Sequence, residues 1–546
     1  MTTVHIGTIG SANISALNLE IGGSRAICDG HWRCQLGHNV GFKVDPRKDE
    51  PIHRQIFDQI VARIQTRAFP PGHKLPPTRV LARELATHRN TVARAYADLE
   101  AAGFVCGSVG RGTFVEDAAL RAASSEVRAP TASPPKPMPW VSIVSRAAQP
   151  EILDRAERWA RRVDGRDVIN LARMQPSDDL LPAELMRRCI GRALAEHGSR
   201  AMSYAPPEGV PRLREAIAQD LASRGVPAAI DDILVTSGSQ QGLDLVARTL
   251  VNPGETVLVE STTYSGAIDL FSIAGARLVP VACDEDGPDP DALRRLNRSD
   301  VKALYTMPTG HNPTGRTMSA ERRHALVSWS RLAGVPLIED DFVAGLALDD
   351  RDGPPHLRAL DGEVIHISTF SKRLIPSLRI GYVVIPPALR ASIRSMKRIV
   401  DLSSSAVLQH ALAEFIERGY LRAHMARTTR EYRTRRDALV GSLRRSLPSE
   451  VGFHVPTHGI ALWLRIPATL DVDAVHTEAL RQGVLVSPGA MWSIDRDASP
   501  GIRLTFCAEP EERLVEGARR LGKILKAMLA RAPTREQRDV RVLEAV

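Results

Sequence analysis

A lysine flanked by hydroxyl groups and an arginine follows a short apolar stretch in the second half of the chain. The segment STFSKRLIPSLR places Thr369, Ser371, Lys372 and Arg379 directly after residues Val364–Ile367. Because burial disfavours the charged form of a lysine, such a residue is either a solvated loop lysine or a reactive amine. A reactive amine could hold a carbonyl cofactor covalently, while the Ser, Thr and Arg side chains bind its phosphate. This segment alone leaves both interpretations open.

Other residues able to do chemistry follow further short apolar stretches. The clearest stretches are ILVTSG, TVLVE, ALYTMP, VPLIEDD and VIHIST, with helical patterns between several of them. This alternation predicts βαβ units and a mainly parallel sheet, which gathers ligands at the ends of its strands. The polar residues at or just after these ends are Ser239, Gln240, Tyr264, Asn312, Asp340 and Lys372.

Each of these residues alone has an ordinary structural role, such as a helix cap, a core aromatic or a turn. Together they fit pyridoxal 5′-phosphate. Its aldehyde reacts with a lysine, its pyridine nitrogen pairs with an anion, and its phosphate binds amides, hydroxyls and an arginine. The free N–H groups of a helix beginning near Ser239 also favour a phosphate. We therefore predict that Lys372 forms a Schiff base with this cofactor, and that Ser371 and Arg379 bind the phosphate.

The composition limits the class of protein. A chain of 546 residues is too long for one ordinary core and predicts two to four domains. The contents of 43% hydrophobic and 25% charged residues are typical of a soluble globular protein, and six scattered cysteines favour reduced thiols and a cytoplasmic setting. We expect neither a membrane span nor a signal peptide, since no long uncharged apolar run is present. The net charge of +9 permits a nucleic-acid partner, and a DNA-bound form would lie at the nucleoid.

Linkers divide the chain into two units. Composition predicts a flexible N-terminal extension at 1–45, a small domain at 48–116, a proline-containing linker at 117–150, a large domain at 151–530 and a tail at 531–546.

The extension carries potential zinc ligands at Cys28, His31, Cys34 and His38. They are spaced more tightly than the usual pair-loop-pair zinc motif, so we favour a disordered extension and predict no metal site.

The small domain has the pattern of a winged helix-turn-helix. Ile52, Ile56, Ile60 and Ile64 form one apolar stripe on a first helix. Thr78 is a plausible N-cap for a second helix through Leu85, and a third helix begins near Asn90. The segment FVCGSVGRGTFV then alternates around glycines like a two-stranded ribbon.

Basic residues of this domain predict contacts with DNA. Residues 51–115 hold nine Lys/Arg and four Asp/Glu, a net charge of +5. A basic third helix followed by a ribbon favours double-stranded operator DNA as the partner, over a merely solvated helix. The candidate DNA-binding residues are Arg79, Arg89, Asn90, Thr91, Arg94 and Arg111.

The small domain resembles the GntR regulators in LPPTRVLARELATHRNTVARAYADLEAAGF and GRGTFV. It departs from that family at His53, Pro77, Ala86 and His88, of which the last two replace a usual turn glycine and a capping serine. These departures predict that the turn before the third helix closes differently, while the exposed face of that helix is kept.

The large domain resembles fold-type I aminotransferases in SYAPPEGVPRLREAIA, TSGSQQGLDL, HNPTG, IEDD, TFSKRLIPSLRIGY and IRLTF. The resemblance implies that Lys372 is the Schiff-base lysine, Asp340 pairs with the pyridine nitrogen and Asn312 bonds the ring hydroxyl. It also implies that Tyr264 stacks on the ring and Arg503 receives the carboxylate of an amino-acid ligand. The residues that would hold the phosphate are Ser239, Gln240, Thr369, Ser371 and Arg379, with Tyr204 contributed by a second subunit of a homodimer.

The two-domain order is similar to that of the MocR regulators, a GntR domain fused to an aminotransferase-like domain. Two residues depart from the family pattern: Phe342 replaces a tyrosine that bonds the cofactor hydroxyl, and Met174 replaces a glycine beside the substrate. Cofactor binding should survive the first change, because a neutral hydrogen bond contributes only about 1 kcal/mol net. The second should narrow the ligand pocket.

Two functions follow from the resemblance. The favoured one is a transcription regulator that binds operator DNA and senses a small amino compound, or the cofactor itself, in its large domain. The alternative is a working aminotransferase with a secondary DNA-binding domain, and sequence alone cannot exclude turnover. The basic winged helix favours the regulator, since a metabolic enzyme does not need it.

Overall fold

The structure is a computed structural model that describes residues 41–46, 50–108, 112–116, 138, 140–148, 168–296, 300–349, 353–494 and 501–531. Two compact units divide between Met138 and Pro139, within the predicted linker. The predicted extension and tail, including Cys28, His31, Cys34 and His38, lie almost wholly outside the described residues.

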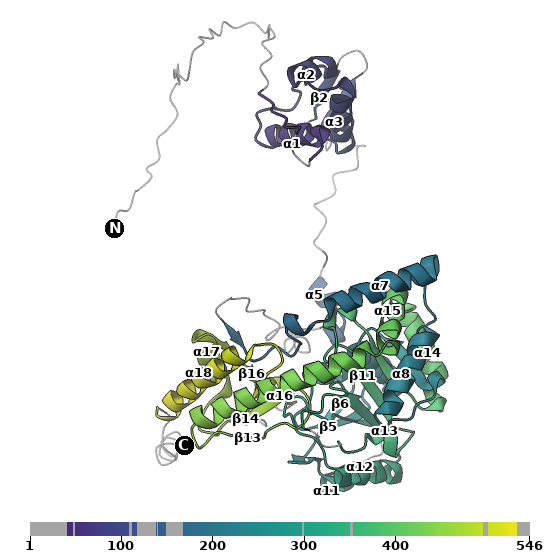
Figure 1. Cartoon of the computed structure of the whole chain (residues 1–546), viewed down its shortest axis with the longest axis vertical. Helices are drawn as coiled ribbons and strands as arrows, with labels where there is room; N and C mark the ends of the chain where they lie inside the picture. Colours follow the sequence, from purple (N-terminus) through teal and green to yellow (C-terminus); the bar gives the residue numbers. More distant parts are fainter. Residues whose placement is uncertain are drawn as a thin grey trace. The chain divides into compact units, whose positions relative to one another are not determined.

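The small unit is a winged helix-turn-helix (Figure 1). Its elements are α1 (Ile52–Gln65), α2 (Thr78–Glu84), α3 (Arg89–Ala101), β1 (Val105–Ser108) and β2 (Gly112–Val115). The predicted stripe is confirmed: Ile56 and Ile60 are fully buried, and Ile52 and Ile64 pack against the same core. The ribbon is antiparallel, with Val105 opposite Val115.

The structure around α2 and the turn to α3 differs from one sequence prediction. It also shows how this turn accommodates two departures from the GntR pattern. Thr78 is not an N-cap: it is the first residue of α2, and Pro77 occupies the cap position without a side-chain bond. Ala86 has a left-handed backbone with φ of 49°, the conformation that a glycine adopts more easily. His88 replaces the capping serine in function, because its Nδ1 accepts the backbone N–H of Asn90 at 3.3 Å.

The large unit is built on a seven-stranded sheet with the order β4-β12-β11-β10-β9-β5-β6. Its strands are β4 (Ile233–Thr236), β5 (Thr256–Glu260), β6 (Arg277–Val281), β9 (Val301–Thr306), β10 (Leu337–Asp341), β11 (Ile365–Thr369) and β12 (Gly381–Val384). The five predicted strands are all confirmed in this sheet. Only β12 runs antiparallel to its neighbours, β11 and β4.

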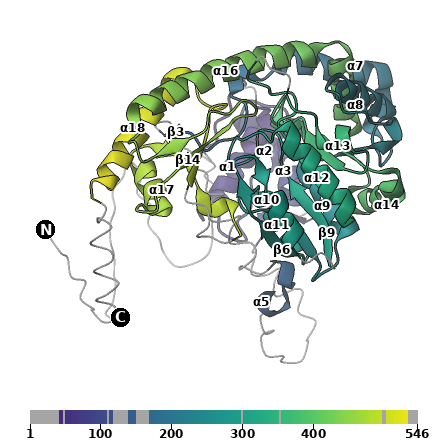
Figure 2. The same cartoon turned by 90° about the horizontal axis from the view of Figure 1, so that it is seen from below.

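Helices cover the sheet and connect it to a second, smaller sheet. The helices of the large unit are α5 (Trp140–Ile143), α7 (Ala183–His197), α8 (Pro211–Ser223), α9 (Ser239–Leu250), α10 (Ser265–Ile273), α11 (Pro290–Arg295), α12 (Ala320–Ala333), α13 (Leu357–Leu360), α14 (Arg390–Asp401), α15 (Ala406–Glu417), α16 (Tyr420–Ser446), α17 (Val472–Arg481) and α18 (Glu511–Leu529). The long helix α16 reaches from α15 to α18 and so spans both sheets (Figure 2).

The second sheet is antiparallel, with the order β13-β14-β17-β16. Its strands are β13 (Gly452–Phe453), β14 (Ala461–Arg465), β16 (Ser487–Pro488) and β17 (Gly501–Thr505). Short pairs complete the unit: β3 (Ile169–Asn170) with β15 (Val484–Leu485), and β7 (Cys283–Asp284) with β8 (Gly287–Pro288). No helix among the described residues is long and apolar enough to cross a membrane.

Candidate cofactor and effector site

The polar residues predicted from the strand ends line one cavity of about 250 Å³ in the large unit. Parallel strands deliver their carboxyl ends to the same edge of the sheet, so residues far apart in sequence meet there. The predicted residues at the cavity are Ser239, Gln240, Tyr264, Asn312, Asp340, Thr369, Ser371, Lys372, Arg379 and Arg503. Tyr204 does not line it: its side chain is 82% exposed.

One end of the cavity is suited to a phosphate. Helix α9 begins there at Ser239, after Gly238 with φ of 90°. A Cβ at position 238 would lie only 2.8 Å from Nη2 of Arg379, so the glycine leaves room for that guanidinium. The hydroxyl of Thr369 donates to Ser371 at 3.0 Å. Free helical N–H groups, hydroxyls and an arginine therefore converge on one point, as a phosphate requires.

Asp340, at the end of β10, also lines the cavity. Its carboxyl group is 4% exposed, and Oδ2 accepts the hydroxyl hydrogen of Tyr305 at 2.7 Å. Burial is the largest of the causes that raise the pKa of Asp340 to about 7; the hydrogen bond from Tyr305 lowers the pKa, and the nearby charges of Asp341 and Glu339 raise it. Oδ1 is buried without a hydrogen-bond partner. A protonated pyridine nitrogen is the kind of donor that would satisfy this oxygen.

Lys372 lies in the turn after β11, and its Nζ donates to the carbonyl oxygen of Met174 at 2.6 Å. Burial is the largest of the causes that lower the pKa of this lysine to about 8; the nearby Cys507 opposes the shift, and the charges of Arg503 and Arg379 add to it. A neutral amine is the form that attacks a carbonyl carbon. Lys372 is therefore poised as a nucleophile near neutral pH.

Tyr264 provides a flat aromatic wall of the same cavity. It precedes α10, and a Cβ on Gly266 would lie 2.5 Å from Cζ of its ring, so that glycine makes room for the aromatic side chain. The Tyr264 hydroxyl donates to Oε1 of Gln240 at 3.0 Å. Burial raises the pKa of Tyr264 to about 12, so the hydroxyl stays protonated. The residues present thus fit pyridoxal 5′-phosphate at its phosphate, ring, pyridine nitrogen and aldehyde.

Arg503 enters the cavity from β17 of the smaller sheet and is 6% exposed. Nη1 donates to Oδ1 of Asn312 at 3.0 Å, and Nη2 donates to the carbonyl of Ala172 at 2.8 Å. Its guanidinium carbon lies 4.3 Å from the ring centroid of Trp492. Burial lowers the pKa of Arg503 to about 10, which still leaves a cation at neutral pH. It is suited to receive a carboxylate.

Sequence reasoning missed several apolar walls of the same cavity. These are Met307, Pro376 and Trp492, which join the two departures already noted, Met174 and Phe342. Trp492 lies in a short helical turn, outside every predicted element, so no periodicity points to it. Apart from Arg503 and the residues predicted to hold the cofactor, the side chains that line the cavity are apolar.

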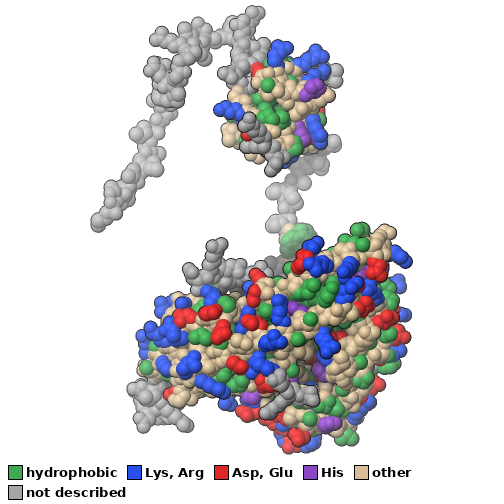
Figure 3. Space-filling model, in the orientation of Figure 1, with side chains coloured by type: hydrophobic (Ala, Val, Ile, Leu, Met, Phe, Trp, Pro, Cys, Tyr) green, Lys and Arg blue, Asp and Glu red, His purple; other side chains and the backbone are tan. Residues whose placement is uncertain are grey.

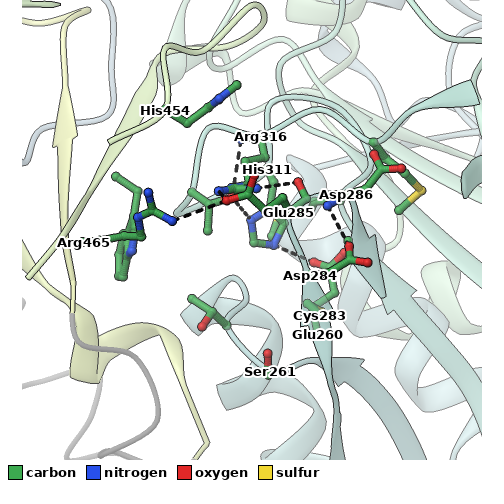
Figure 4. A pocket seen from close by; sticks show the side chains of 16 residues that line it. Glu260, Ser261, Cys283, Asp284, Glu285, Asp286, His311, Arg316, His454 and Arg465 are labelled. Atoms are coloured by element: carbon green, nitrogen blue, oxygen red, sulfur yellow. Dashed lines mark hydrogen bonds and ion pairs between the residues drawn. The ribbon is translucent and has the colours of Figure 1, made fainter. Parts of the chain in front are cut away.

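A second cavity of about 390 Å³, whose lining side chains are drawn in Figure 4, shares Met307 with the first. His311, the residue before Asn312, lies there with Nε2 at 2.6 Å from the buried carboxylate of Glu260. Elsewhere in the lining of this cavity, the carboxylate of Glu285 forms ion pairs with two arginines. Arg316, in a loop that connects strands of the seven-stranded sheet, lies 3.1 Å from it, and Arg465 of β14 lies 3.4 Å from it. An ion pair between the two sheets therefore lies at the edge of this cavity.

The predicted DNA-binding residues are mostly available to solvent. Arg79, Arg89, Asn90 and Arg94 are exposed, and Thr91 is half-buried. Arg111 lies outside the described residues. The visible face of the small unit carries several Lys and Arg side chains and few acidic ones (Figure 3). These features suit a polyanionic partner.

The fold and the cavity define the class: a DNA-binding winged helix joined to a pyridoxal-phosphate-dependent domain of fold type I. Residues 52–115 match the bacterial regulatory proteins of the gntR family, and residues 166–521 match the class I and II aminotransferases. The chain belongs to the MocR-type transcriptional regulators, which combine these two domains.

Relatives of both kinds support this assignment. The "Probable rhizopine catabolism regulatory protein MocR" of Rhizobium meliloti is 30% identical over 89% of this chain and 96% of its own length. The HTH-type transcriptional regulator TauR of Rhodobacter capsulatus is 28% identical over 89% of this chain and 99% of its own. The crystal structure of LysN, an alpha-aminoadipate aminotransferase from Thermus thermophilus, is 31% identical, covers 67% of this chain and 94% of its own, and has a TM-score of 0.63.

Proposed function

We propose that this protein is a transcription regulator whose large domain, with pyridoxal 5′-phosphate on Lys372, senses a small amino compound bearing a carboxylate. Its winged helix binds operator DNA. The observation that carries the proposal is the meeting of Lys372, Asp340 and Arg503 at one cavity.

Each of these three side chains has a distinct task. Lys372 would hold the cofactor through Nζ, which in this structure donates to the Met174 carbonyl at 2.6 Å. Asp340 holds the pyridine nitrogen through its unpartnered Oδ1. Arg503 fixes the effector's carboxylate, which places the effector's amine toward Lys372. When bound, the cofactor supplies an electrophilic carbon and an electron-withdrawing ring.

The size and the lining of the cavity limit which effectors can bind. A volume of about 250 Å³ must hold both cofactor and effector, and Met174 stands beside Arg503, with its Sδ 4.0 Å from Nη1. Apart from residues assigned to the cofactor, the walls are Met174, Met307, Phe342, Pro376 and Trp492. We propose a short amino acid without a second charged group.

Signalling requires that the effector bind two arrangements of the protein unequally, since equal binding shifts no equilibrium. We propose a homodimer, in which Tyr204 of each chain completes the other chain's phosphate site. Its 82% exposed ring is consistent with a role outside its own chain. A two-fold dimer carries two winged helices and suits an operator with two half-sites.

An active aminotransferase is the second candidate function. The same cavity holds Lys372 together with Asp340 and Arg503, and the related LysN structure is that of an aminotransferase. Phe342 weakens this alternative, because it removes the hydroxyl that would hold the cofactor's ring oxygen.

Two parallel assays on the purified protein separate these functions. Operator fragments are titrated with and without candidate amino acids, and product is counted over many turnovers with amino donors and a keto acceptor. A regulator changes its DNA affinity with effector and makes at most about one product per site. Sustained turnover with DNA affinity unaffected by every amino acid would contradict the proposal.

A further inference from the structure

A second cluster of chemically capable residues lies behind the cofactor site, on the other face of β10. Successive side chains of a strand point to opposite faces, so Glu339 and Asp341 face away from the cavity that Asp340 enters. Glu339 is fully buried, and its neighbour in the register of β11 is the fully buried His366. His356, half-buried, joins them from the residue just before α13.

The spacing of these three residues is that of metal ligands. One ligand atom from each of Glu339, His356 and His366 lies within 4.8 Å of the others. Oε2 of Glu339 is 3.0 Å from Nδ1 of His366, and Oε1 is 3.4 Å from Nδ1 of His356. Two ligands bound at about 2.0–2.1 Å to a tetrahedral ion lie roughly 3.4 Å apart, so no large movement is needed.

Hydrogen bonds fix the carboxylate of Glu339, and a nitrogen of the neighbouring His356 lacks a partner. Glu339 accepts the backbone N–H groups of Leu357 and Arg358 at 3.0 and 3.1 Å, and its Oε2 also hydrogen-bonds Nδ1 of His366 at 3.0 Å. These contacts hold the carboxylate in place, and a bound ion would replace the contact with His366. Nδ1 of His356 is buried without a hydrogen-bond partner. A buried polar atom left unpaired is destabilising, and a bound cation would satisfy it.

The carboxylate of Asp341 lies near the second ring nitrogen of His366. Nε2 of His366 has no hydrogen-bond partner and lies 3.7 Å from Oδ2 of Asp341. That oxygen is anchored by Nη1 of Arg224 at 2.9 Å. Histidines that bind metals through one nitrogen commonly direct the other N–H at a carboxylate, and this pair has that arrangement.

We propose that Glu339, His356 and His366 bind a divalent transition-metal ion of the zinc type. Two imidazoles and one carboxylate form a ligand set used for zinc, with one position left for water. The ion would join β10, β11 and the segment before α13 on the face opposite the cofactor, and the half-buried His356 provides its route from solvent.

The experiment uses the full chain with its cofactor, purified through a tag without histidine. The extension carries Cys28, His31, Cys34 and His38, so every measurement is made in a Cys28→Ser, Cys34→Ser background to remove that competing site. After chelation and dialysis, the protein is titrated with Zn²⁺, and bound metal is counted by mass spectrometry after gel filtration. Co²⁺ is the spectroscopic probe, because its visible bands report the coordination of the ion.

We expect one Zn²⁺ per chain and visible Co²⁺ bands without a thiolate charge-transfer band. His356→Ser at the rim and His366→Gln inside should each weaken Zn²⁺ binding at least about tenfold, since even loss of an outer partner typically costs 10–100-fold. His324→Ser, an exposed histidine of α12, is the matched control and should bind normally.

The unchanged cofactor spectrum of His356→Ser is the test that it has folded. If the background protein binds less than about a tenth of an ion per chain, the cluster is a hydrogen-bonded network and the proposal is wrong. It is equally wrong if His356→Ser binds Zn²⁺ as tightly as the control.

Discussion

The arginines of the small unit and those of the cofactor cavity differ in their surroundings. Arg89 and Arg94 are exposed on α3, whereas Arg503 is 6% exposed and its guanidinium is held by Asn312 and a backbone carbonyl. An exposed cation acts through screened, long-range attraction and suits a polyanion. A buried and pre-oriented cation suits one carboxylate of defined position. The two units thus use the same side chain for affinity in one place and selectivity in the other.

The largest expected effect comes from replacing the lysine of the buried cofactor cavity. Lys372→Ala should abolish cofactor trapped by borohydride, because no other described lysine lines the cavity. The measurement is protein mass after reduction, with Lys302→Ala, a half-exposed lysine paired with Glu255, as the control. Full trapping in the Lys372→Ala variant would mean that the cofactor lysine is misassigned.

The pH dependence of cofactor uptake tests the burial of the same lysine. Its pKa of about 8 means that the amine is protonated below that pH and neutral above it. The rate at which apoprotein takes up cofactor should therefore rise about tenfold per pH unit up to pH 8 and level off above it. Stopped-flow absorbance measures the rate. A midpoint near 10.5 would show that the lysine is solvated.

Removing the charge of Arg503 tests selectivity. Arg503→Met keeps most of the volume beside Trp492 and should weaken binding of a carboxylate effector by about 1.5–3 kcal/mol, the usual range for a hydrogen bond to a charged group. Basal DNA affinity and cofactor colour should persist. The control is Arg465→Met on β14, whose side chain is 63% exposed. A normal effector response in Arg503→Met would place carboxylate binding elsewhere.

DNA binding through the exposed arginines of α3 should depend on the salt concentration, unlike effector binding through the buried Arg503. Arg89→Ala or Arg94→Ala should cost about 1–3 kcal/mol where the arginine reads a base, or lower the salt slope by about one where it contacts a phosphate. Fluorescence anisotropy at several salt concentrations measures both. Arg54→Ala on α1, an exposed arginine paired with Asp58, is the control. Unchanged binding by the double variant would mean that α3 is not the DNA-binding helix.

The smallest expected effect concerns Phe342. Phe342→Tyr restores a hydroxyl at the cavity wall and should strengthen cofactor binding by about 1 kcal/mol, the net value of one neutral hydrogen bond. Equilibrium dialysis of the cofactor measures it. A weaker cofactor affinity in this variant would show that the apolar wall is itself favourable.

Sequence predicted which residues lie together where strand ends determine their position. Asp340 and Lys372 end or follow buried strands with clear apolar patterns, so their meeting follows from a parallel sheet. Trp492 and Met307 could not be foreseen, because contacts between the two sheets depend on tertiary packing. The antiparallel β12 was also missed, since a short apolar run carries no direction. Thr78 was misplaced by one position, because helix ends are the least certain feature of a sequence pattern.

The alternation along β10 has a consequence for the tolerance of this protein to insertions and deletions. Glu339, Asp340 and Asp341 are three consecutive acids, yet only the middle one faces the cofactor cavity. Because the side-chain period of a strand is two, a shift of one residue exchanges the two faces. Deletion of one residue before Glu339 would then turn two carboxylates toward the cavity and leave one behind it, although the acidic motif would still be complete in the sequence.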